Sequence, residues 1–235
     1  MIYVTSEKKK IKALLKELGA DLSGIGDVYP YLPASLKDMP IAISFAVRLS
    51  HRILEEISPV NGPSQTYFHH YRSINTFIDQ ISLKTMLAIQ QMGYNAYVIP
   101  ASQSLNDKNS KYRGMVSHRM TATRSGLGWI GKSGNLITED FGPEIRLGTV
   151  LTSMPMEVDL PIEQSQCDDC LICVKACPAY ALAGMHHWLP GIERELLVDP
   201  ERCSQHMKKA YQHIGRGAVC GICMRVCPKG SKKEP

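Results

Sequence analysis

Eight cysteines lie between residues 167 and 227 of this 235-residue chain, in two runs of regular spacing plus one isolated residue. The first run has the pattern C-x2-C-x2-C-x3-C-P and consists of Cys167, Cys170, Cys173 and Cys177. The second run lacks the first member of that pattern and consists of Cys220, Cys223 and Cys227. Three cysteines at steps of three residues can hold three corners of a metal cube, and a remote cysteine followed by proline can hold the fourth. The spacing therefore predicts two [4Fe–4S] clusters.

Each cluster needs a fourth ligand from outside its own run, as in the bacterial ferredoxin pattern, where the fourth cysteine binds the other cluster. The full spacing counted back from Cys227 falls on Gly217, so one ligand is missing. Cys203 is the remaining cysteine, and we expect it to fill the gap. The first cluster is then expected on Cys167, Cys170, Cys173 and Cys227. The second is expected on Cys177, Cys203, Cys220 and Cys223.

Two alternatives to iron–sulfur clusters are structural zinc sites and a disulfide framework. Zinc sites usually pair two separated C-x2-C units, which three consecutive three-residue steps fit poorly. Disulfides belong to oxidising compartments. The N-terminus has neither the apolar stretch of a secretory signal nor a twin-arginine pair, and no apolar run is long enough to span a membrane. We therefore expect a cytoplasmic protein without a membrane span.

Composition is that of an ordinary globular protein, with 44% hydrophobic and 21% charged residues and a mean hydropathy of −0.14. The formal net charge is +5 with cysteines counted as neutral. Two clusters, each about −2 with its four thiolates, lower that charge to about +1, because the ligands bind deprotonated. A nucleic-acid partner is therefore unlikely on charge, and binding through the basic termini is the weakest alternative.

Hydrophobic periodicity predicts interleaved helices and strands before the cysteines. Helices are expected at 6–18, capped by Ser6, and at 65–92. Strands are expected at 41–47, 94–99, 136–138 and 146–152. This pattern predicts an α+β domain over residues 1–161, followed by a two-cluster module over residues 162–235.

A glycine-rich segment, TATRSGLGWIGKSGN at residues 121–135, precedes the cysteines. Glycines let the backbone approach a large flat or phosphate-bearing ligand closely. They also occur in plain turns, where Trp129 would serve as an anchor. Both interpretations stay open from the residues alone.

The segments RSGLGWIGK, LITEDFGPEIRLGTVLTSMPME, CDDCLICVKACP, VDPERCSQH and CGICMRVCP resemble epoxyqueuosine reductase. That family is related to the reductive dehalogenases, which are cobalamin-dependent iron–sulfur reductases. The resemblance is strong from Arg119 to Pro228 and weaker before it, and Cys203 falls where the family keeps its isolated ligand.

This resemblance implies a nitroreductase-like domain that binds cobalamin, followed by a bacterial ferredoxin-like module that feeds electrons to cobalt. The cofactor would carry the hard chemistry and the protein would position it. The resemblance places cofactor-binding residues around the glycine-rich segment, namely His118, Arg119, Arg124, Gly126, Gly128, Trp129, Gly131 and Lys132. For the charged residues among them, a solvent-exposed salt bridge is the alternative role.

The chain departs from the family at its proton donor. Epoxyqueuosine reductases carry an acidic donor upstream of the glycine-rich segment, but the matching stretch here contains no carboxylate in register, and Asp107 aligns only with a gap. Reductive dehalogenases use a tyrosine beside a cation, for which Tyr112 and Arg113 are the candidates. We also expect the chain to lack the family's C-terminal helical-repeat domain, which is associated with tRNA.

These observations lead to two expected functions. The first is reduction of a small organic substrate, with electrons supplied by a donor such as a ferredoxin or flavodoxin. The alternative is an electron-transfer or corrinoid-handling protein without its own turnover, which the missing carboxylate favours.

Overall fold

The computed structural model describes residues 2–102, 105 and 111–230, with side chains from residue 6 onward. Its helices are α1 (Ile2–Glu17), α2 (His51–Leu54), α3 (Gln65–Gln91), α4 (His118–Arg124), α5 (Ile172–Lys175), α6 (Pro200–Tyr211) and α7 (Ile222–Arg225). Its strands are β1 (Leu22–Asp27), β2 (Ile41–Arg48), β3 (Ala96–Ile99), β4 (Trp129–Ile130), β5 (Leu136–Ile137) and β6 (Ile145–Thr152). Short 3-10 helices are η1 (Tyr29–Tyr31), η2 (Ala34–Leu36), η3 (Arg194–Leu196) and η4 (Gly215–Gly217).

The expected mixture of helices and strands is confirmed. The strands expected at 41–47 and 146–152 are β2 and β6, and the long helix expected at 65–92 is α3. The expected helix start at Ser6 is wrong, because α1 already begins at Ile2. Local pattern did not reveal β1, whose sequence LSGIGD contains two glycines and little apolar alternation.

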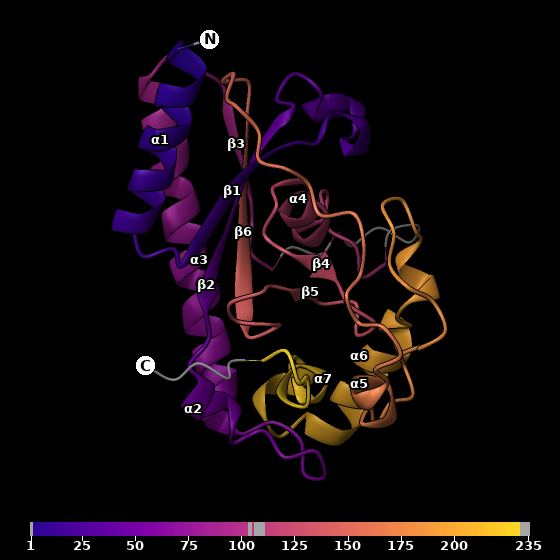
Figure 1. Cartoon of the computed structure of the whole chain (residues 1–235). Helices are drawn as coiled ribbons and strands as arrows, with labels where there is room; N and C mark the ends of the chain where they lie inside the picture. Colours follow the sequence, from indigo (N-terminus) through magenta and orange to yellow (C-terminus); the bar gives the residue numbers. More distant parts are fainter. Residues whose placement is uncertain (1, 103–104, 106–110, 231–235) are drawn as a thin grey trace. The chain divides into compact units, whose positions relative to one another are not determined.

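Four strands form one sheet in the order β1-β2-β6-β3, and β4 and β5 form a separate hairpin (Figure 1). The outer pairs are antiparallel, with Ile25 opposite Ile43 and Val98 opposite Val150. The two faces of the sheet bury different groups of apolar residues, because neighbouring residues on a strand point to opposite faces.

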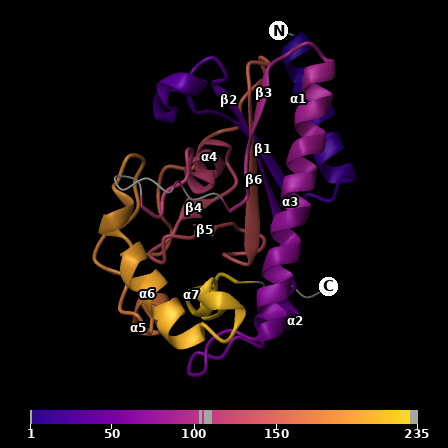
Figure 2. The same ribbon diagram turned by 180° about the vertical axis from the view of Figure 1, so that it is seen from behind.

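One face of the sheet packs against α1 and α3, which lie together on the same side of the strands in both views (Figure 1 and Figure 2). Its core contains Ile11 and Leu15 from α1, Ile78 and Ile81 from α3, and Ile43, Phe45 and Val150 from the sheet. The opposite face buries Val28, Leu32, Leu36, Met39, Ala42, Ile99, Val116 and Leu151. Both faces of this sheet are therefore covered.

Small residues decide how closely elements of this sheet approach their neighbours. A Cβ atom added to Gly148 on β6 would lie 2.2 Å from the ring of Phe45, which is fully buried on β2. A Cβ at Gly24 on β1 would lie 2.0 Å from the backbone oxygen of Ser125, directly after α4. These glycines are therefore required by packing.

The chain forms two compact units. The first consists of residues 1–47, 74–127 and 146–162, and contains the four-stranded sheet. The second consists of residues 48–73, 128–145 and 163–235. The division into a cofactor-binding domain over residues 1–161 and a cluster module over residues 162–235 stays a prediction. None of the helices in the described part of the chain has the length and apolar character needed to cross a membrane.

The second unit joins two earlier segments to the cysteine-containing part of the chain. Positions 62 and 215 leave no room for a side chain, since added Cβ atoms would lie 2.2 Å from Tyr211 and Phe68 respectively. Gly142, in the turn after β5, has φ +54° and lies against the backbone of Lys229, whose oxygen would be 2.0 Å from an added Cβ. The β4–β5 hairpin is therefore packed against the loop that follows the last cysteine.

Candidate metal centre

All eight cysteines are free thiols and all are half-buried. The short helices α5 and α7 carry Cys173 and Cys223, and each is followed two residues later by a cysteine, Cys177 or Cys227, that precedes a proline. The segments CLICVKACP and CGICMRVCP thus form the same short turn of helix twice. Cys203 lies separately, within α6.

The thiols influence one another in two sets. Burial raises the pKa of Cys173 to about 11, with further contributions from Cys227, Cys167 and Cys170. Burial also raises the pKa of Cys203 to about 11, with contributions from Cys220 and Cys177. Burial raises the pKa of Cys223 to about 12, and here Cys220 and Cys203 contribute most among the other thiols.

These sets coincide with the two groups of four expected from the spacing. Cys173 also contributes to the raised pKa of Cys223, so the two sets are neighbours. Four crowded thiols resist losing their protons in the metal-free chain, whereas metal ligation requires thiolates and supplies the compensating positive charge. The residues present therefore suit a metal that binds four thiolates at each site.

Several N–H groups point at the cysteine sulfurs. The side-chain amide of Asn135 donates to Sγ of Cys223 over 3.5 Å, and the backbone N–H of Ala181 donates to Sγ of Cys177 over 3.5 Å. The backbone of Lys229 and Gly230 hydrogen bonds to the Cys227 thiol and opposes the rise of its pKa by burial. Such N–H···S contacts stabilise negative charge on sulfur and tune the potentials of iron–sulfur clusters.

Position 217 explains why the second run lacks its first cysteine. Gly217 has φ +64°, and a Cβ atom there would lie 2.6 Å from Cα of Lys208 on α6. A side chain therefore has no room at this position. The helix that blocks it, α6, carries Cys203.

Among the described residues, no three His, Cys, Asp or Glu side chains are close enough together to hold a single metal ion. A [4Fe–4S] cluster has a different requirement, because its four cysteines bind four separate irons.

The glycine-rich segment is divided between the two units. Its first part, with the expected cofactor residues His118, Arg119, Arg124 and Gly126, belongs to the first unit. Its second part, with Gly128, Trp129, Gly131 and Lys132, forms β4 and the turn after it in the second unit.

In the second unit, these residues lie beside the cysteines. A Cβ atom at Gly131 would lie 3.1 Å from Sγ of Cys167, so this glycine lets the backbone approach a ligand sulfur. Lys132 is 5% exposed and its Nζ donates to the carbonyl oxygen of Asp168 over 2.6 Å. A Cβ at Gly128 would lie 2.1 Å from the backbone oxygen of Ile137 on β5. In each of these three cases the atom that lies close belongs to the protein itself.

Trp129 differs from its neighbours in having an unused polar group. It is 3% exposed, and its Nε1–H has no hydrogen-bond partner among the described residues. The ammonium group of Lys229 lies 5.9 Å from the ring centroid. A buried indole N–H usually has an acceptor, so Trp129 offers a donor that a bound cofactor could use.

In the first unit, His118 is fully engaged by the protein. Its Nδ1 contacts Oγ1 of Thr149 at 2.8 Å and its Nε2 contacts the carbonyl oxygen of Pro100 at 3.0 Å. Burial lowers its pKa. The guanidinium of Arg124 lies 5.9 Å from the ring centroid of Tyr31, and Gly126 has φ +72° with its Cα against the backbone of Leu160. Arg119 is half-buried on α4.

The candidate proton donor Tyr112 has a left-handed backbone, with φ +63°. The ammonium group of Lys111 lies 5.3 Å from its ring centroid, and Arg113 is exposed and accepts a backbone hydrogen bond from Leu105. Non-glycine residues in this region are strained and are enriched at functional sites. Asp107 lies outside the described residues.

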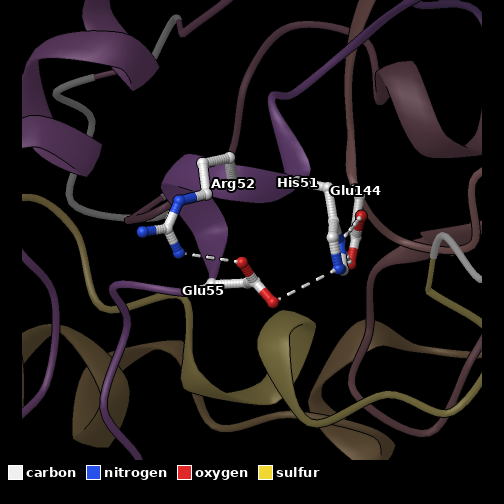
Figure 3. Close-up of polar contacts among 4 residues, drawn as sticks. All are labelled: His51, Arg52, Glu55 and Glu144. Carbon is white, nitrogen blue, oxygen red and sulfur yellow. Dashed lines mark hydrogen bonds and ion pairs between the residues drawn. The ribbon is translucent and has the colours of Figure 1, made fainter. Parts of the chain in front are cut away.

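Sequence reasoning missed a buried carboxylate beside the cysteine loop. Glu144 is 2% exposed, and its Oε2 lies 3.0 Å from Nδ1 of His51 (Figure 3). Nε2 of His51 in turn lies 3.9 Å from Oε1 of Glu55, which also pairs with Arg52 (Figure 3). A Cβ atom at Gly230 would lie 2.6 Å from Oε1 of Glu144, so the carboxylate needs a glycine there. The sequence signal for this carboxylate was its place at the end of the short turn FGPE. The histidine that pairs with Glu144, His51, lies 93 residues away in the chain.

The comparisons with known proteins agree with the geometry of the second unit. Residues 166–230 match the family of 4Fe-4S double cluster binding domains. Over 140 residues the chain is 32% identical to the epoxyqueuosine reductase of Synechocystis sp., covering 54% of this chain and 45% of that protein. Over 143 residues it is 30% identical to the epoxyqueuosine reductase of Bacillus anthracis, covering 57% and 35%.

Two kinds of solved structure share the fold. A catabolic reductive dehalogenase in complex with 3-bromo-4-hydroxybenzoic acid matches 96% of this chain and 32% of its own, with a TM-score of 0.72 and 22% identity. An epoxyqueuosine reductase bound to an epoxyqueuosine-modified tRNA-Tyr stem loop matches 95% of this chain and 65% of its own, with a TM-score of 0.59 and 17% identity.

The chain spans less than half the length of the two curated relatives. The resemblance seen in the sequence is nevertheless confirmed, on both sequence and fold. Residues 166–230 form a double [4Fe–4S] cluster domain, in a chain related to the epoxyqueuosine reductases and sharing its fold with the reductive dehalogenases.

Proposed function

We propose that this chain is an iron–sulfur oxidoreductase that passes single electrons from two [4Fe–4S] clusters to a bound cobalamin, for reduction of a small organic substrate. The observation that carries the proposal is the assembly, in one compact unit, of two sets of four thiols with the β4–β5 hairpin of the glycine-rich segment. The nitroreductase-like character of residues 1–161 and the cytoplasmic location belong to the same proposal.

The protein's own residues supply ligation, charge compensation and exclusion of water. Cys167, Cys170, Cys173 and Cys227 hold one cluster, and Cys177, Cys203, Cys220 and Cys223 hold the other. Asn135 and the backbone N–H groups around Cys227 stabilise negative charge on sulfur. Bound clusters accept and release one electron at a time, and cobalamin supplies a strongly reducing centre.

The glycine-rich segment is the proposed cobalamin site. Support comes from the buried, unused Nε1–H of Trp129 and from a reductive dehalogenase of the same fold, which is described as B12-dependent. His118, Arg119, Arg124, Gly126, Gly128, Gly131 and Lys132 complete the proposed set. Tyr112, with Arg113 beside it in the sequence, is the proposed proton donor, and its left-handed backbone supports that role.

Anaerobic reconstitution with iron, sulfide and cobalamin tests this function. The wild-type protein is expected to retain cobalamin with the absorption spectrum of the base-off form after gel filtration. Trp129→Phe keeps an aromatic side chain and removes the indole N–H, so the variant is expected to retain several-fold less cobalamin at unchanged iron content. Failure of the wild type to retain any cobalamin would rule out the cobalamin-dependent reaction.

A second candidate function is electron transfer or corrinoid handling without turnover of a substrate. It is favoured by Lys132 and Gly128, which are engaged with protein atoms in the structure. Under this alternative the clusters are reduced and pass electrons to another protein. Stopped-flow transfer to an acceptor protein, without consumption of any halogenated or epoxide substrate, distinguishes it from the reductase.

A further inference from the structure

Five basic residues follow one another along α6 and the loop after it, at intervals of four and three residues: Arg202, His206, Lys209, His213 and Arg216. At this spacing Arg202, His206 and Lys209 share one face of α6. The backbone of Gln212 continues the helical conformation beyond Tyr211, and Arg216 follows in η4. All five except the half-buried His206 are exposed.

Arg216 is presented by a strained loop. Its own φ is +61°, and its neighbours Gly215 and Gly217 also have positive φ, +73° and +64°. Both glycines are packed so tightly that a Cβ atom would lie 2.2 Å from Phe68 or 2.6 Å from Lys208. A left-handed backbone at an arginine, held between two tightly packed glycines, raises the free energy of the folded state. Such backbone strain is concentrated at functional sites.

A second strained residue lies near the start of the same helix. Tyr180 has φ +49° and is 82% exposed. The backbone oxygen of the next residue, Ala181, accepts from the N–H of Asp199, which caps α6. We call the set of Tyr180, Arg202, His206, Lys209, His213 and Arg216 the α6 surface.

The helix dipole, which usually accounts for basic residues near a helix C-terminus, does not account for all the cations of the α6 surface. Lys209 lies in the last turn, where a cation complements the helix dipole. Arg202, however, lies in the first turn, where the dipole disfavours a cation, and only Asp199 at 3.4 Å compensates it. Within the described part of the chain, Lys209 and Arg216 have no ion-pair partner. Their charge is available to a partner molecule.

The residues of the α6 surface and the second set of cysteines alternate along the chain. Cys203 lies on α6 itself, Cys177 precedes Tyr180 by three residues, and Cys220 follows Arg216 by four. Cys203 lies three residues before His206 on α6, and a helix is only about 10–12 Å across with its side chains, so a protein resting on the basic residues of α6 lies close to the Cys203 thiol.

We infer that the α6 surface docks a small acidic electron-transfer protein, which delivers electrons to the cluster held by the second set of cysteines. Exposed tyrosine and arginine are the residue types that most often dominate binding energy at interfaces. A basic surface steers an acidic partner during encounter. In each transfer the docked protein loses one electron and the cluster gains one, and no bond forms or breaks. The inference rests on the proposed iron–sulfur function.

Stopped-flow reduction of the reconstituted protein by reduced flavodoxin, an acidic carrier, tests the docking surface. The triple variant Arg202→Gln/Lys209→Gln/Arg216→Gln is compared with Lys9→Gln/Lys16→Gln/Lys84→Gln, which removes the same charge from exposed positions on α1 and α3. Photoreduction by neutral 5-deazaflavin provides the reference, because it needs no docked protein.

The α6 triple variant is expected to react with flavodoxin about tenfold or more slowly at low salt, in line with the effect of electrostatic steering on association rates. Its rate is also expected to lose most of its salt dependence, while the control triple variant behaves as wild type. Tyr180→Ala is expected to slow the reaction several-fold at every salt concentration, since it removes contact area and not charge. All variants are expected to reach full reduction with deazaflavin.

Equal flavodoxin rates for the wild type and the α6 variant, with full reduction by deazaflavin, would overturn the docking surface alone. No reduction of the wild type by flavodoxin, or equal slowing by the control variant, would overturn it as well. An RNA stem-loop bound by the wild type and released by the α6 variant, at unchanged flavodoxin rate, would assign the surface to nucleic acid instead. Clusters that deazaflavin cannot reduce would overturn the proposed function itself.

Discussion

Cys203 and Gly217 mark the one irregularity in an otherwise repeated cysteine motif. The repeat demands a cysteine at position 217, but the left-handed backbone there is packed against α6. Cys203 on α6 belongs to the same set of thiols as Cys220 and Cys177, which contribute to its raised pKa. Single residues elsewhere in the second unit have similarly specific roles, such as Gly131 beside Cys167.

Replacing Cys203 is expected to remove one cluster and leave the other. Cys203→Ala removes the ligand atom and should lower iron from about eight to about four per chain, because each cubane holds four irons. Cys203→Ala/Gly217→Cys is expected not to restore the loss, since position 217 has no room for a side chain. Iron and sulfide analysis with EPR of the reduced protein measures both variants. Ser204→Ala is the control, and eight irons in Cys203→Ala would contradict the ligand assignment.

Removing His51 is expected to destabilise the protein, because it leaves the buried carboxylate of Glu144 without its cationic or hydrogen-bonding partner. His51→Ala should lower the free energy of unfolding by roughly 1–3 kcal/mol, less than for a fully buried pair because His51 is 26% exposed. Arg52→Ala, which breaks the neighbouring exposed ion pair with Glu55, should cost less than about 1 kcal/mol. Urea titration followed by circular dichroism compares them, and equal midpoints would refute the role of the buried pair.

At the scale of elements, one aspartate ties together three parts of the first unit. The backbone N–H of Ile25 on β1 donates to Oδ2 of Asp159, and Lys8 and Lys12 on α1 each lie 2.8 Å from its carboxylate. Burial alone would raise the pKa of Asp159, but hydrogen bonds from the two lysines and Ile25 outweigh it and lower the pKa. The segment after β6 is thereby held to both α1 and β1.

This carboxylate should make stability depend on pH in the acid range. A lowered pKa in the folded state means that its contribution is complete above the unfolded value of 3.8 and is lost as the pH falls through the folded pKa. Asp159→Asn is expected to cost about 1–2 kcal/mol at pH 7, because partial exposure screens the lysines. Thermal unfolding from pH 7 to pH 2 measures the effect, and the variant and wild type should converge at the acid end. A constant difference down to pH 2 would exclude the ionised carboxylate as the cause.

At the scale of the whole molecule, the two units have different sources of stability. The first unit has two apolar cores, one on each face of its sheet. The second unit buries scattered apolar residues among short helices and loops, including Trp188, Leu197, Tyr211 and Val219. Small modules with little core usually depend on metal for their fold.

Removing iron is therefore expected to loosen the second unit selectively. Hydrogen–deuterium exchange of protein treated anaerobically with a chelator should show lost protection in residues 163–230, and retained protection in β2, β6 and the part of α3 from Ile74 onward. Slowly exchanging amides report the local free energy of opening, so the two units are measured separately. Equal loss of protection in both units would show that the iron also stabilises the first unit.

The sequence by itself determined a double [4Fe–4S] cluster domain and predicted its ligands as two sets of four, because ligand spacing is a local property that a short turn of backbone must satisfy. It also determined α3 from its periodic apolar residues and β2 from a short continuous apolar run, and it placed β6 between turn residues. These features depend on residues that are close together in the chain.

Only the tertiary structure decided which distant segments join the cysteines. Residues 48–73 and 128–145 belong to the second unit because glycines at 62, 142 and 215 let them pack there. The pairing of Glu144 with His51 and the exclusion of a side chain at Gly217 have the same origin. Each depends on contacts between residues far apart in the chain, and a linear pattern carries no record of which distant residues share a surface.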